Sequence, residues 1–544
     1  MAEAVISAPF GGLPVAQDQA PNKWLVTVSV SFGTLMGAID GSIVNVALDH
    51  MRGSVGATLQ EITWVVTGFA LANVVVMPLT AFLSRLFGQK RVYMTCLGIF
   101  LAGSALCGMA HTLPELVAFR FLQGLGAGAL QPTEQSILRR TWPLEEQGMA
   151  MALFGLAVMI GPALGPTLGG YIIDRYSWPW IFYINIPIGL FGLSMVWAFV
   201  HEPKEETQRL KTEAALQRKN MDWWGIGLLS TGLAGLEYVL EQGQQDNWFD
   251  SRLITGLTIF VVFALVAFVI RELYAKVPAV NIRLFKEPSF LSGTVIGGLQ
   301  FLMLMANMFL LPVFMQDMLG FTAFQSGMAL MPRVFIMSIT TPLVGWLFNR
   351  VDARYIIATG VVLVSLGSIQ MAHLNLDSSS HDIIFAILVQ GAGFSCLFVP
   401  LTTTALARIP RKHMTDATGL NSLIRLVGGA VGIAIFATLL GNYSNDAQTA
   451  LVAHLSPTRP AVAQRLSLVQ HGLMAKGFDP ASAHAGAIQS LYGTVMRQAM
   501  VLSFDRIFLF VGVLFLSVLP VVFFLKTINV RELRKRPKAH LEME

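Results

Sequence analysis

Asp40 and Arg120 are the residues of this 544-residue chain with the most informative chemistry. Asp40 interrupts the apolar run VSVSFGTLMGAIDGSIVNVAL between Val28 and Leu48, and Arg120 stands near the start of another apolar run. A charge at the centre of a membrane costs roughly 2.5–3.5 kcal/mol, so we expect it to be paired, protonated or functional. With a helical rise of about 1.5 Å per residue, both fall at a similar depth, which makes them candidate partners. Such a carboxylate could exchange its guanidinium partner for a proton; a static pair that specifies packing is the alternative.

Two further acidic residues are candidates for the same proton coupling. Glu134 lies near the inner end of one apolar run, where it could instead reach interfacial water, and Glu237 lies within another run. Polar and aromatic residues that could line a substrate cavity are Asn45, Trp64, Asn73, Gln123, Gln131, Gln300, Asn307, Gln390 and Asn421. Each of these could equally hold neighbouring helices together. A wide and mostly apolar cavity would suit hydrophobic or cationic amphiphilic compounds.

The elements that must position these residues are transmembrane helices. Hydrophobic residues make up 54% of the chain and charged residues 13%, against about 25% charged residues in globular proteins. A helix needs roughly 20 apolar residues to cross a membrane. The sequence therefore predicts an all-α polytopic membrane protein with fourteen spans, at 24–47, 61–83, 91–110, 114–138, 149–172, 179–200, 223–242, 252–271, 290–316, 325–348, 355–373, 383–407, 419–441 and 506–526.

The charge distribution predicts the orientation. Most of the 37 Lys and Arg residues fall in the tails and in alternate loops, which the positive-inside rule places in the cytoplasm together with both termini. The basic pI of 9.1 then reflects contact with lipid headgroups and not nucleic-acid binding. The first 23 residues lack a basic signal region, so we expect no cleaved signal peptide. The three cysteines lie inside spans, which argues against a disulfide framework or a metal site.

Two motifs repeat at one interval and indicate a duplicated six-helix unit. QGLG from Gln123 recurs as QGAG from Gln390, and GPALG from Gly161 recurs as GGAVG from Gly428, at the same interval along the chain. Such repeats place a substrate site between the halves near the midplane. The predicted organisation is an N-terminal tail (1–23), a six-helix bundle (24–200), a linker (201–222), two inserted helices (223–272), a linker (273–289), a second bundle (290–527) that includes an outer helical loop (442–505), and a basic tail (528–544).

The segment GPALGPTLGG carries the strongest resemblance to a known family. With IDGSIVNVALDHM (39–51), RFLQGLGAGA (120–129) and WPWIFYINIPIG (178–189), it resembles the major facilitator family, specifically the fourteen-helix EmrB/QacA-type drug:proton antiporters. The resemblance implies that the antiporter motif seals and hinges the bundle interface; a kinked packing helix is the plainer interpretation. The motif residues are Gly161, Pro162, Gly165, Pro166, Gly169 and Gly170. Cytoplasmic loop motifs include Arg85, Gly88, Arg91, Arg350 and Arg354, with Arg85 standing where the superfamily has Asp.

The resemblance also implies a function. We expect a bacterial inner-membrane exporter of hydrophobic or amphiphilic toxic compounds that works by alternating access, with the proton gradient as energy source and no cofactor or metal. A periplasmic adaptor protein and an outer-membrane channel are possible partners, and the outer loop could dock them or fold back as a lid. Export of lipids, fatty acids or siderophores on the same scaffold is the alternative. A membrane enzyme is a remote alternative, because the spans contain no HExxH or GxSxG motif. A sensor is another, because we expect neither terminus to have room for an output domain.

Overall fold

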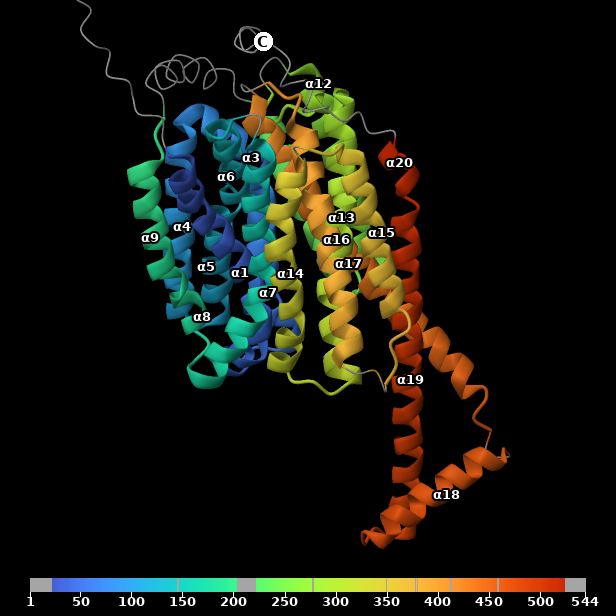
Figure 1. The fold of residues 1–544 in the computed structure, drawn as a ribbon. Helices are drawn as coiled ribbons and strands as arrows, with labels where there is room; N and C mark the ends of the chain where they lie inside the picture. The colour runs from blue at the N-terminus through green and yellow to red at the C-terminus, as the bar shows by residue number, and fades with distance from the viewer. Residues whose placement is uncertain are drawn as a thin grey trace, which may run out of the picture.

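The computed structural model describes residues 22–143, 146–202, 222–275, 278–348, 350–376, 378, 380–410, 413–456 and 459–523, and contains no strand among them. Most of its helices stand side by side with their axes roughly aligned (Figure 1). Twelve of the described helices are long and apolar enough to cross a membrane. The predicted spans at 114–138 and 223–242 fall outside that group, so the count of fourteen stays a prediction.

The N-terminal bundle contains six helical segments, several of them interrupted. They are α1 (Lys23–Val55), α2 (Leu59–Ile62) with α3 (Trp64–Phe87), α4 (Gln89–Met109), α5 (Leu113–Ala127) with α6 (Leu130–Thr141), α7 (Gln147–Arg175), and α8 (Trp180–Tyr183) with α9 (Asn185–Phe199). The span expected over 114–138 is thus two helices that meet at Gly128. Pro132 explains this break, because it has no N–H to bond the carbonyl of Gly128.

The second half contains an inserted pair and a second bundle. The insertion comprises α11 (Trp223–Gln242), η2 (Trp248–Asp250), α12 (Arg252–Tyr274) and η3 (Ile282–Lys286); the second bundle comprises α13 (Pro288–Val313), η4 (Phe314–Met318), α14 (Ala323–Phe348), α15 (Ala353–Met371), α16 (Ser380–Leu406), α17 (Met414–Val452), α18 (Pro460–Ala475), α19 (Pro480–Leu516) and α20 (Leu519–Phe523). The bundles meet where α7 packs on α14 and α3 on α17. Helix α11 contacts both α3 and α17, and α12 packs outside it.

A long helical hairpin, formed by the end of α17, α18 and the first half of α19, projects beyond the bundle (Figure 1). The sequence predicts a separate loop over 442–505, and the structure differs. Helix α17 continues to Val452, and α19 runs unbroken from Pro480 into the bundle, because no proline interrupts it after its first residue. Asp479 is the expected N-cap, accepting hydrogen bonds from the backbone N–H groups of Ala481 and Ser482, both at 3.0 Å.

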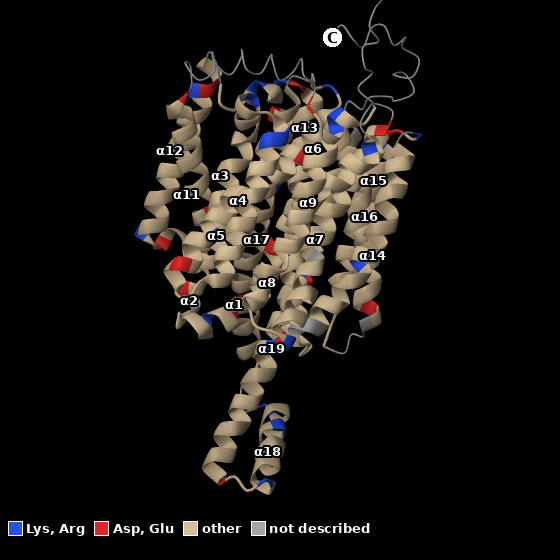
Figure 2. Ribbon diagram, turned by 90° about the vertical axis from the view of Figure 1, so that its left-hand side faces the viewer, with Lys and Arg blue, Asp and Glu red and all other residues tan. Residues whose placement is uncertain are grey.

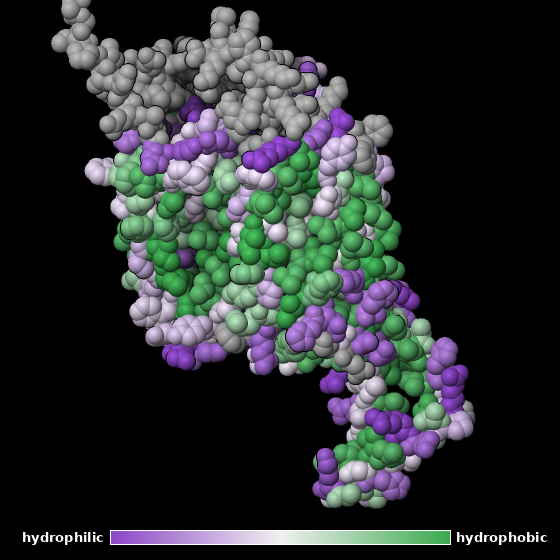
Figure 3. Space-filling view, in the orientation of Figure 1, coloured by the Kyte–Doolittle hydropathy of each residue, from purple (hydrophilic) through white to green (hydrophobic). Residues whose placement is uncertain are grey.

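The charged residues mark the two ends of the bundle. Lys and Arg gather at the end opposite the hairpin (Figure 2), and a continuous apolar surface separates this end from the hairpin end (Figure 3). By the positive-inside rule we assign the basic end to the cytoplasm and name it the cytoplasmic end; the hairpin end is the outer end. Residues 1–21, 203–221 and 524–544 lie outside the described residues, so the placement of both tails and of the first linker stays a prediction.

Candidate functional site

Asp40 and Arg120 form an ion pair in the interior of the N-terminal bundle. The Nη1 atom of Arg120 on α5 donates to Oδ2 of Asp40 on α1 at 2.5 Å. Their exposed fractions are 0% for Asp40 and 1% for Arg120. Since each charge is out of water, removing one partner would leave the other buried and uncompensated, which typically costs about 3–5 kcal/mol. The two residues that the sequence places at a similar depth are therefore direct partners.

Three neutral side chains complete a polar network around the pair. Gln123 donates to Oδ1 of Asp40 at 2.9 Å and accepts from Arg120 at 2.8 Å. Asn185 on α9 also donates to Oδ1 at 3.0 Å, and it donates to Ser104 on α4 at 3.1 Å. Gln123 was a predicted cavity residue, whereas Asn185 and Ser104 were not anticipated. An asparagine inside the apolar segment IFYINIPIG was the available signal.

Arg120 has partners that do not depend on the carboxylate. Its Nε donates to the carbonyl of Val65 on α3 at 3.1 Å. Its guanidinium lies 4.3 Å from the ring centre of Phe69 and 5.7 Å from that of Phe182. Cation–π contacts of this kind strengthen where water is excluded. The guanidinium can therefore remain buried if Asp40 becomes neutral.

The opposite face of α1 packs on the glycine-rich segment of α7. A Cβ at Gly165 would lie 2.8 Å from Cβ of Ser42, and one at Gly169 would lie 2.9 Å from Cγ1 of Ile43. A Cβ at Gly161 would collide with Ala38. Helix α7 continues through Pro162 and Pro166, and Gly170 is buried. The glycines of this motif thus allow α1 and α7 to approach closely, on the helix that also carries Asp40.

Glu134 is fully buried on α6, away from the ion pair. One of its oxygens accepts from Ser31 on α1 at 2.9 Å, and the other has no hydrogen-bond partner. Within the described part of the chain no cationic side chain lies within salt-bridge distance of Glu134. The expectation that Glu134 could reach interfacial water does not fit, because its exposed fraction is 0%.

Glu237 is buried on the inserted helix α11, also apart from the ion pair. It is 7% exposed, and its Oε2 has no hydrogen-bond partner. Glu241 lies one turn further along α11 and likewise has an oxygen without a partner. Their helix contacts α3 of the first bundle and α17 of the second. A role for Glu237 in coupling stays a prediction.

The hydrogen bonds among the described residues do not join the candidate cavity residues into one network. Gln390 and Asn307 share a hydrogen bond in the second bundle, and Gln300 donates to the carbonyl of Phe394. Asn421 is buried with both polar atoms unpartnered. The remaining candidates are scattered: Asn45 is exposed on α1, Asn73 and Gln131 are half-buried, and Trp64 is 40% exposed. A shared cavity of these residues stays a prediction.

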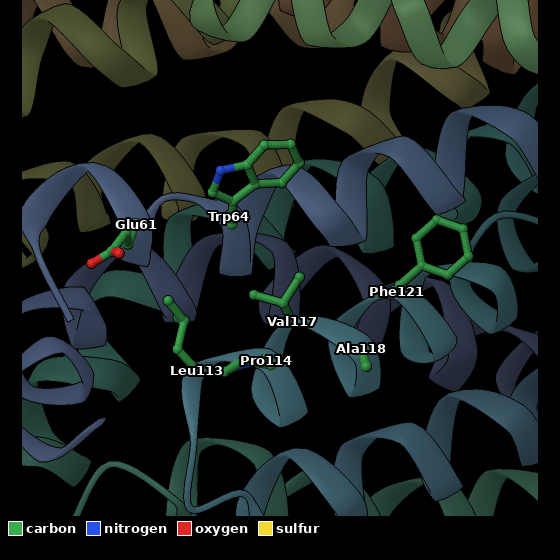
Figure 4. Close-up of a pocket in the computed structure, with 7 residues that line it drawn as sticks. All are labelled: Glu61, Trp64, Leu113, Pro114, Val117, Ala118 and Phe121. Carbon is green, nitrogen blue, oxygen red and sulfur yellow. The ribbon is translucent and has the colours of Figure 1, made fainter. Parts of the chain in front are cut away.

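Trp64 lines an apolar groove between α2–α3 and α5 near the outer end (Figure 4). The groove has a volume of about 540 Å³ and includes neither Asp40 nor Arg120. Its lining residues are Glu61, Trp64, Leu113, Pro114, Val117, Ala118 and Phe121. The indole of Trp64 also packs against Tyr238 on α11, with ring centres 5.7 Å apart. Trp64 thus lies where the insertion meets the N-terminal bundle.

Arg85 joins the two bundles at the cytoplasmic end. Its Nη1 donates to both carboxylate oxygens of Asp416 on α17, at 2.7 and 2.9 Å. Its Nη2 donates to the carbonyls of Pro278 and Ala279 at 3.3 Å. Thr418 on α17 also donates to the carbonyl of Pro132, at 3.1 Å. Arg85, at the position where the resemblance leads us to expect Asp, is therefore paired with Asp416 of the other bundle.

The other loop-motif residues have local contacts at the same end. Gly88 has a φ of +87°, which favours glycine, and ends α3 next to the carboxylate of Glu202. Arg91 is exposed on α4. The guanidinium of Arg350 lies 3.7 Å from the ring centre of Trp346. The backbone N–H of Arg354 donates to Asp352, the N-cap of α15.

The fold and the buried ion pair define a polytopic helical membrane protein with two bundles and a charged centre inside one of them. A model of the Major Facilitator Superfamily matches residues 30–433. The chain belongs to the major facilitator superfamily, a family of transporters, and the resemblance drawn from the motifs is confirmed.

Relatives give a more detailed comparison. The chain is 31% identical to the multidrug export protein EmrB of Haemophilus influenzae, covering 92% of this chain and 95% of the relative. It is 30% identical to EmrB of Escherichia coli K12 (92% and 95%) and 31% identical to the fatty acid resistance protein FarB of Neisseria gonorrhoeae (92% and 96%). The human organic anion transporter MFSD10 shares the fold, with a TM-score of 0.54 at 14% identity over 91% of this chain and all of that one.

Proposed function

We propose that the protein is a proton-coupled antiporter that exports hydrophobic or amphiphilic compounds from bacterial cells across the inner membrane. The observation that carries this proposal is the buried Asp40–Arg120 pair on adjacent helices of the N-terminal bundle. Support also comes from the printed names of the relatives, which describe multidrug export and fatty acid resistance. FarB favours fatty acids as a second class of substrate.

Protonation of Asp40 would change the contacts of α1. A neutral carboxyl group holds the guanidinium less strongly, while Arg120 keeps Gln123, Val65 and the ring of Phe69. Helix α1 then loosens from α5. Because α1 also packs on the α7 glycines, its movement is passed to α7, which packs on α14 of the second bundle. Proton binding is thereby linked to the relative position of the two bundles.

The membrane potential supplies enough energy for useful export. One proton that crosses 100 mV releases about 2.3 kcal/mol. Since about 1.36 kcal/mol corresponds to a tenfold change in concentration, one proton per substrate sustains a gradient of roughly fiftyfold.

The outer hairpin is the part of the chain that we propose contacts a periplasmic adaptor protein, which would continue the export route to an outer-membrane channel. Its tip lies far beyond the apolar surface of the bundle (Figure 3). Large apolar side chains are exposed along it, among them Leu468, Phe478, Ile488 and Tyr492. Apolar residues exposed outside the membrane commonly mark a protein–protein contact.

Asp40→Asn tests the coupling directly. Purified protein in liposomes with an imposed pH gradient should drive transport of a cationic dye, and Asp40→Asn should abolish this transport while dye binding stays measurable. Asp49→Asn is the matched control, because Asp49 lies on the same helix but is exposed and pairs with Arg52. Gradient-driven transport by Asp40→Asn at the rate of the control would refute the proposal.

A further inference from the structure

A second polar network lies in the C-terminal bundle and repeats the pattern around Asp40. The interval from Asp40 to Asn307 along the chain equals the interval from Gln123 to Gln390. Gln390 donates to Oδ1 of Asn307 at 3.2 Å, as Gln123 donates to Oδ1 of Asp40. The duplication has therefore placed an amide where the first half has its carboxylate.

A buried arginine also joins the second network, although it comes from α14 and not from α16, the helix that corresponds to α5. Nη2 of Arg333 on α14 donates to Oε1 of Gln390 at 3.0 Å. Gln390 in turn donates to Ser368 on α15 at 2.9 Å. The arrangement matches that in which Arg120 donates to Oε1 of Gln123. In both networks a glutamine thus links a buried guanidinium to the side chain at one repeat position, which is Asp40 in the first half and Asn307 in the second.

The two networks differ in charge. Arg120 pairs directly with Asp40, whereas the position that corresponds to Asp40 is the neutral Asn307, which Gln390 links to Arg333. Arg333 is 1% exposed, and its Nε and Nη1 atoms have no hydrogen-bond partner. No carboxylate of the described residues forms a salt bridge with it. A buried cation without a counter-charge is costly, so its retention needs a reason.

We propose that Arg333, with Gln390 and Asn307, binds the carboxylate of an amphiphilic organic anion. The free Nε–H and Nη1–H groups are donors that suit a carboxylate, which takes paired N–H bonds from arginine. The neighbouring residues Leu330 and Met337 belong to the apolar core of this bundle, so a hydrocarbon tail would have apolar neighbours. This inference rests on the proposed function, since the anion would belong to the fatty-acid class of exported compounds.

The charge of the second bundle supports this assignment. Arg425 is a second buried cation there, 5% exposed, with its guanidinium 4.5 Å from the ring centre of Phe398. Among the described residues, the buried acid of this bundle is Asp416, and it is paired with Arg85. The first bundle instead buries Asp40 and Glu134. Proton and anion would therefore bind in different halves of the molecule.

Binding of octanoate tests the site. Purified protein in nanodiscs of neutral lipid at pH 8, without any gradient, is titrated with octanoate, octanol and octyltrimethylammonium. We expect Arg333→Gln to weaken octanoate binding at least tenfold and to change binding of the other two by less than twofold. Arg175→Gln removes the same charge from an exposed position near Tyr171 and should leave all three unchanged.

Asn307→Asp is the second variant and preserves the shape of the side chain. Its new carboxylate supplies the missing counter-charge, so octanoate binding should fall at least tenfold, as expected for Arg333→Gln. The Asn307→Asp variant therefore tests the proposal even if the Arg333→Gln protein folds poorly. The proposal is overturned if Asn307→Asp binds octanoate within twofold of the unaltered protein, or if octanol binds as tightly as octanoate. A third measurement compares how octanoate and chloride, at equal concentration, protect the protein against thermal unfolding. Equal protection by the two anions, lost in both cases in Arg333→Gln, would also overturn the proposal. Because no gradient is applied, these outcomes are independent of the Asp40→Asn test.

Discussion

Arg85→Ala should open the cytoplasmic end of the protein. The substitution removes two charge-assisted hydrogen bonds to Asp416, whose side chain is 2% exposed, and two bonds to the carbonyls of the segment before α13. Breaking a buried ion pair costs roughly 3–5 kcal/mol, and we take about 3 kcal/mol because a quarter of the Arg85 side chain is exposed. If the pair forms only while the bundles touch, the ratio of closed to open forms falls roughly 100-fold, at about 1.4 kcal/mol per factor of ten.

Cysteine labelling measures this ratio. Thr418→Cys places a thiol in the same contact, since Thr418 is 0% exposed and donates to the carbonyl of Pro132. In inside-out vesicles, an impermeant maleimide should label Cys at this position roughly 100-fold faster when Arg85→Ala is added. The same chain without the new thiol corrects for the native cysteines, which lie inside helices.

Two further variants give the comparison its controls. Arg91→Ala removes an exposed arginine near the same end and should not alter labelling. Exchanging the charges, as Arg85→Asp with Asp416→Arg, should restore closure only in part, because position 416 lies in the first turn of α17, where the helix dipole favours an acid by about 0.3–1 kcal/mol. Labelling of Arg85→Ala at the unaltered rate would refute the idea that this pair holds the bundles together.

Two other outcomes follow from packing and from the hairpin. Gly165→Ala should lower the thermal unfolding midpoint of the purified protein, because the new methyl group meets Ser42 and overpacking costs about 1–3 kcal/mol; Gly37→Ala, which meets no atom within 4 Å, should not. Equal midpoints would contradict the close contact of α1 with α7. Replacing residues 449–491 by a short Gly/Ser linker should leave liposome transport unchanged but reduce the drug resistance of cells, since Gln448 and Tyr492 are already in hydrogen-bond contact at 3.2 Å. Loss of liposome transport would instead show that the hairpin is structural.

The sequence predicted what depends on local pattern. Apolar runs of sufficient length located the helices. The similar depths of Asp40 and Arg120 along two such runs suggested their pairing only together with the helix arrangement that the family resemblance implies. The Asp-Pro dipeptide located the start of α19, because capping is a property of neighbouring residues. The break between α5 and α6 was not predicted, although Pro132 is its cause. The segment around Pro132 is apolar and rich in glycine, so its pattern indicates one continuous span.

What the sequence left open depends on contacts between distant segments. Asn185 and Ser104 join the site from α9 and α4, and hydropathy cannot indicate which way a polar side chain in an apolar helix points. Arg85 and Asp416 lie far apart in the sequence, in opposite halves of the chain, and only the approach of α3 to α17 makes their pairing evident. A cavity shared by the candidate residues stays a prediction for the same reason, since polarity alone does not specify which helix face meets the bundle centre.

The unbroken course of α19 has a mechanical consequence. At about 1.5 Å per residue, its 37 residues form a rod roughly 55 Å long that begins near the hairpin tip and ends inside the C-terminal half. Such a rod acts as a lever arm, so a tilt of that half by about 10° would sweep the tip through roughly 10 Å. If the halves tilt in this way during the proposed transport cycle, a protein bound at the tip would be displaced in each cycle, and holding the tip fixed would slow transport from outside the membrane.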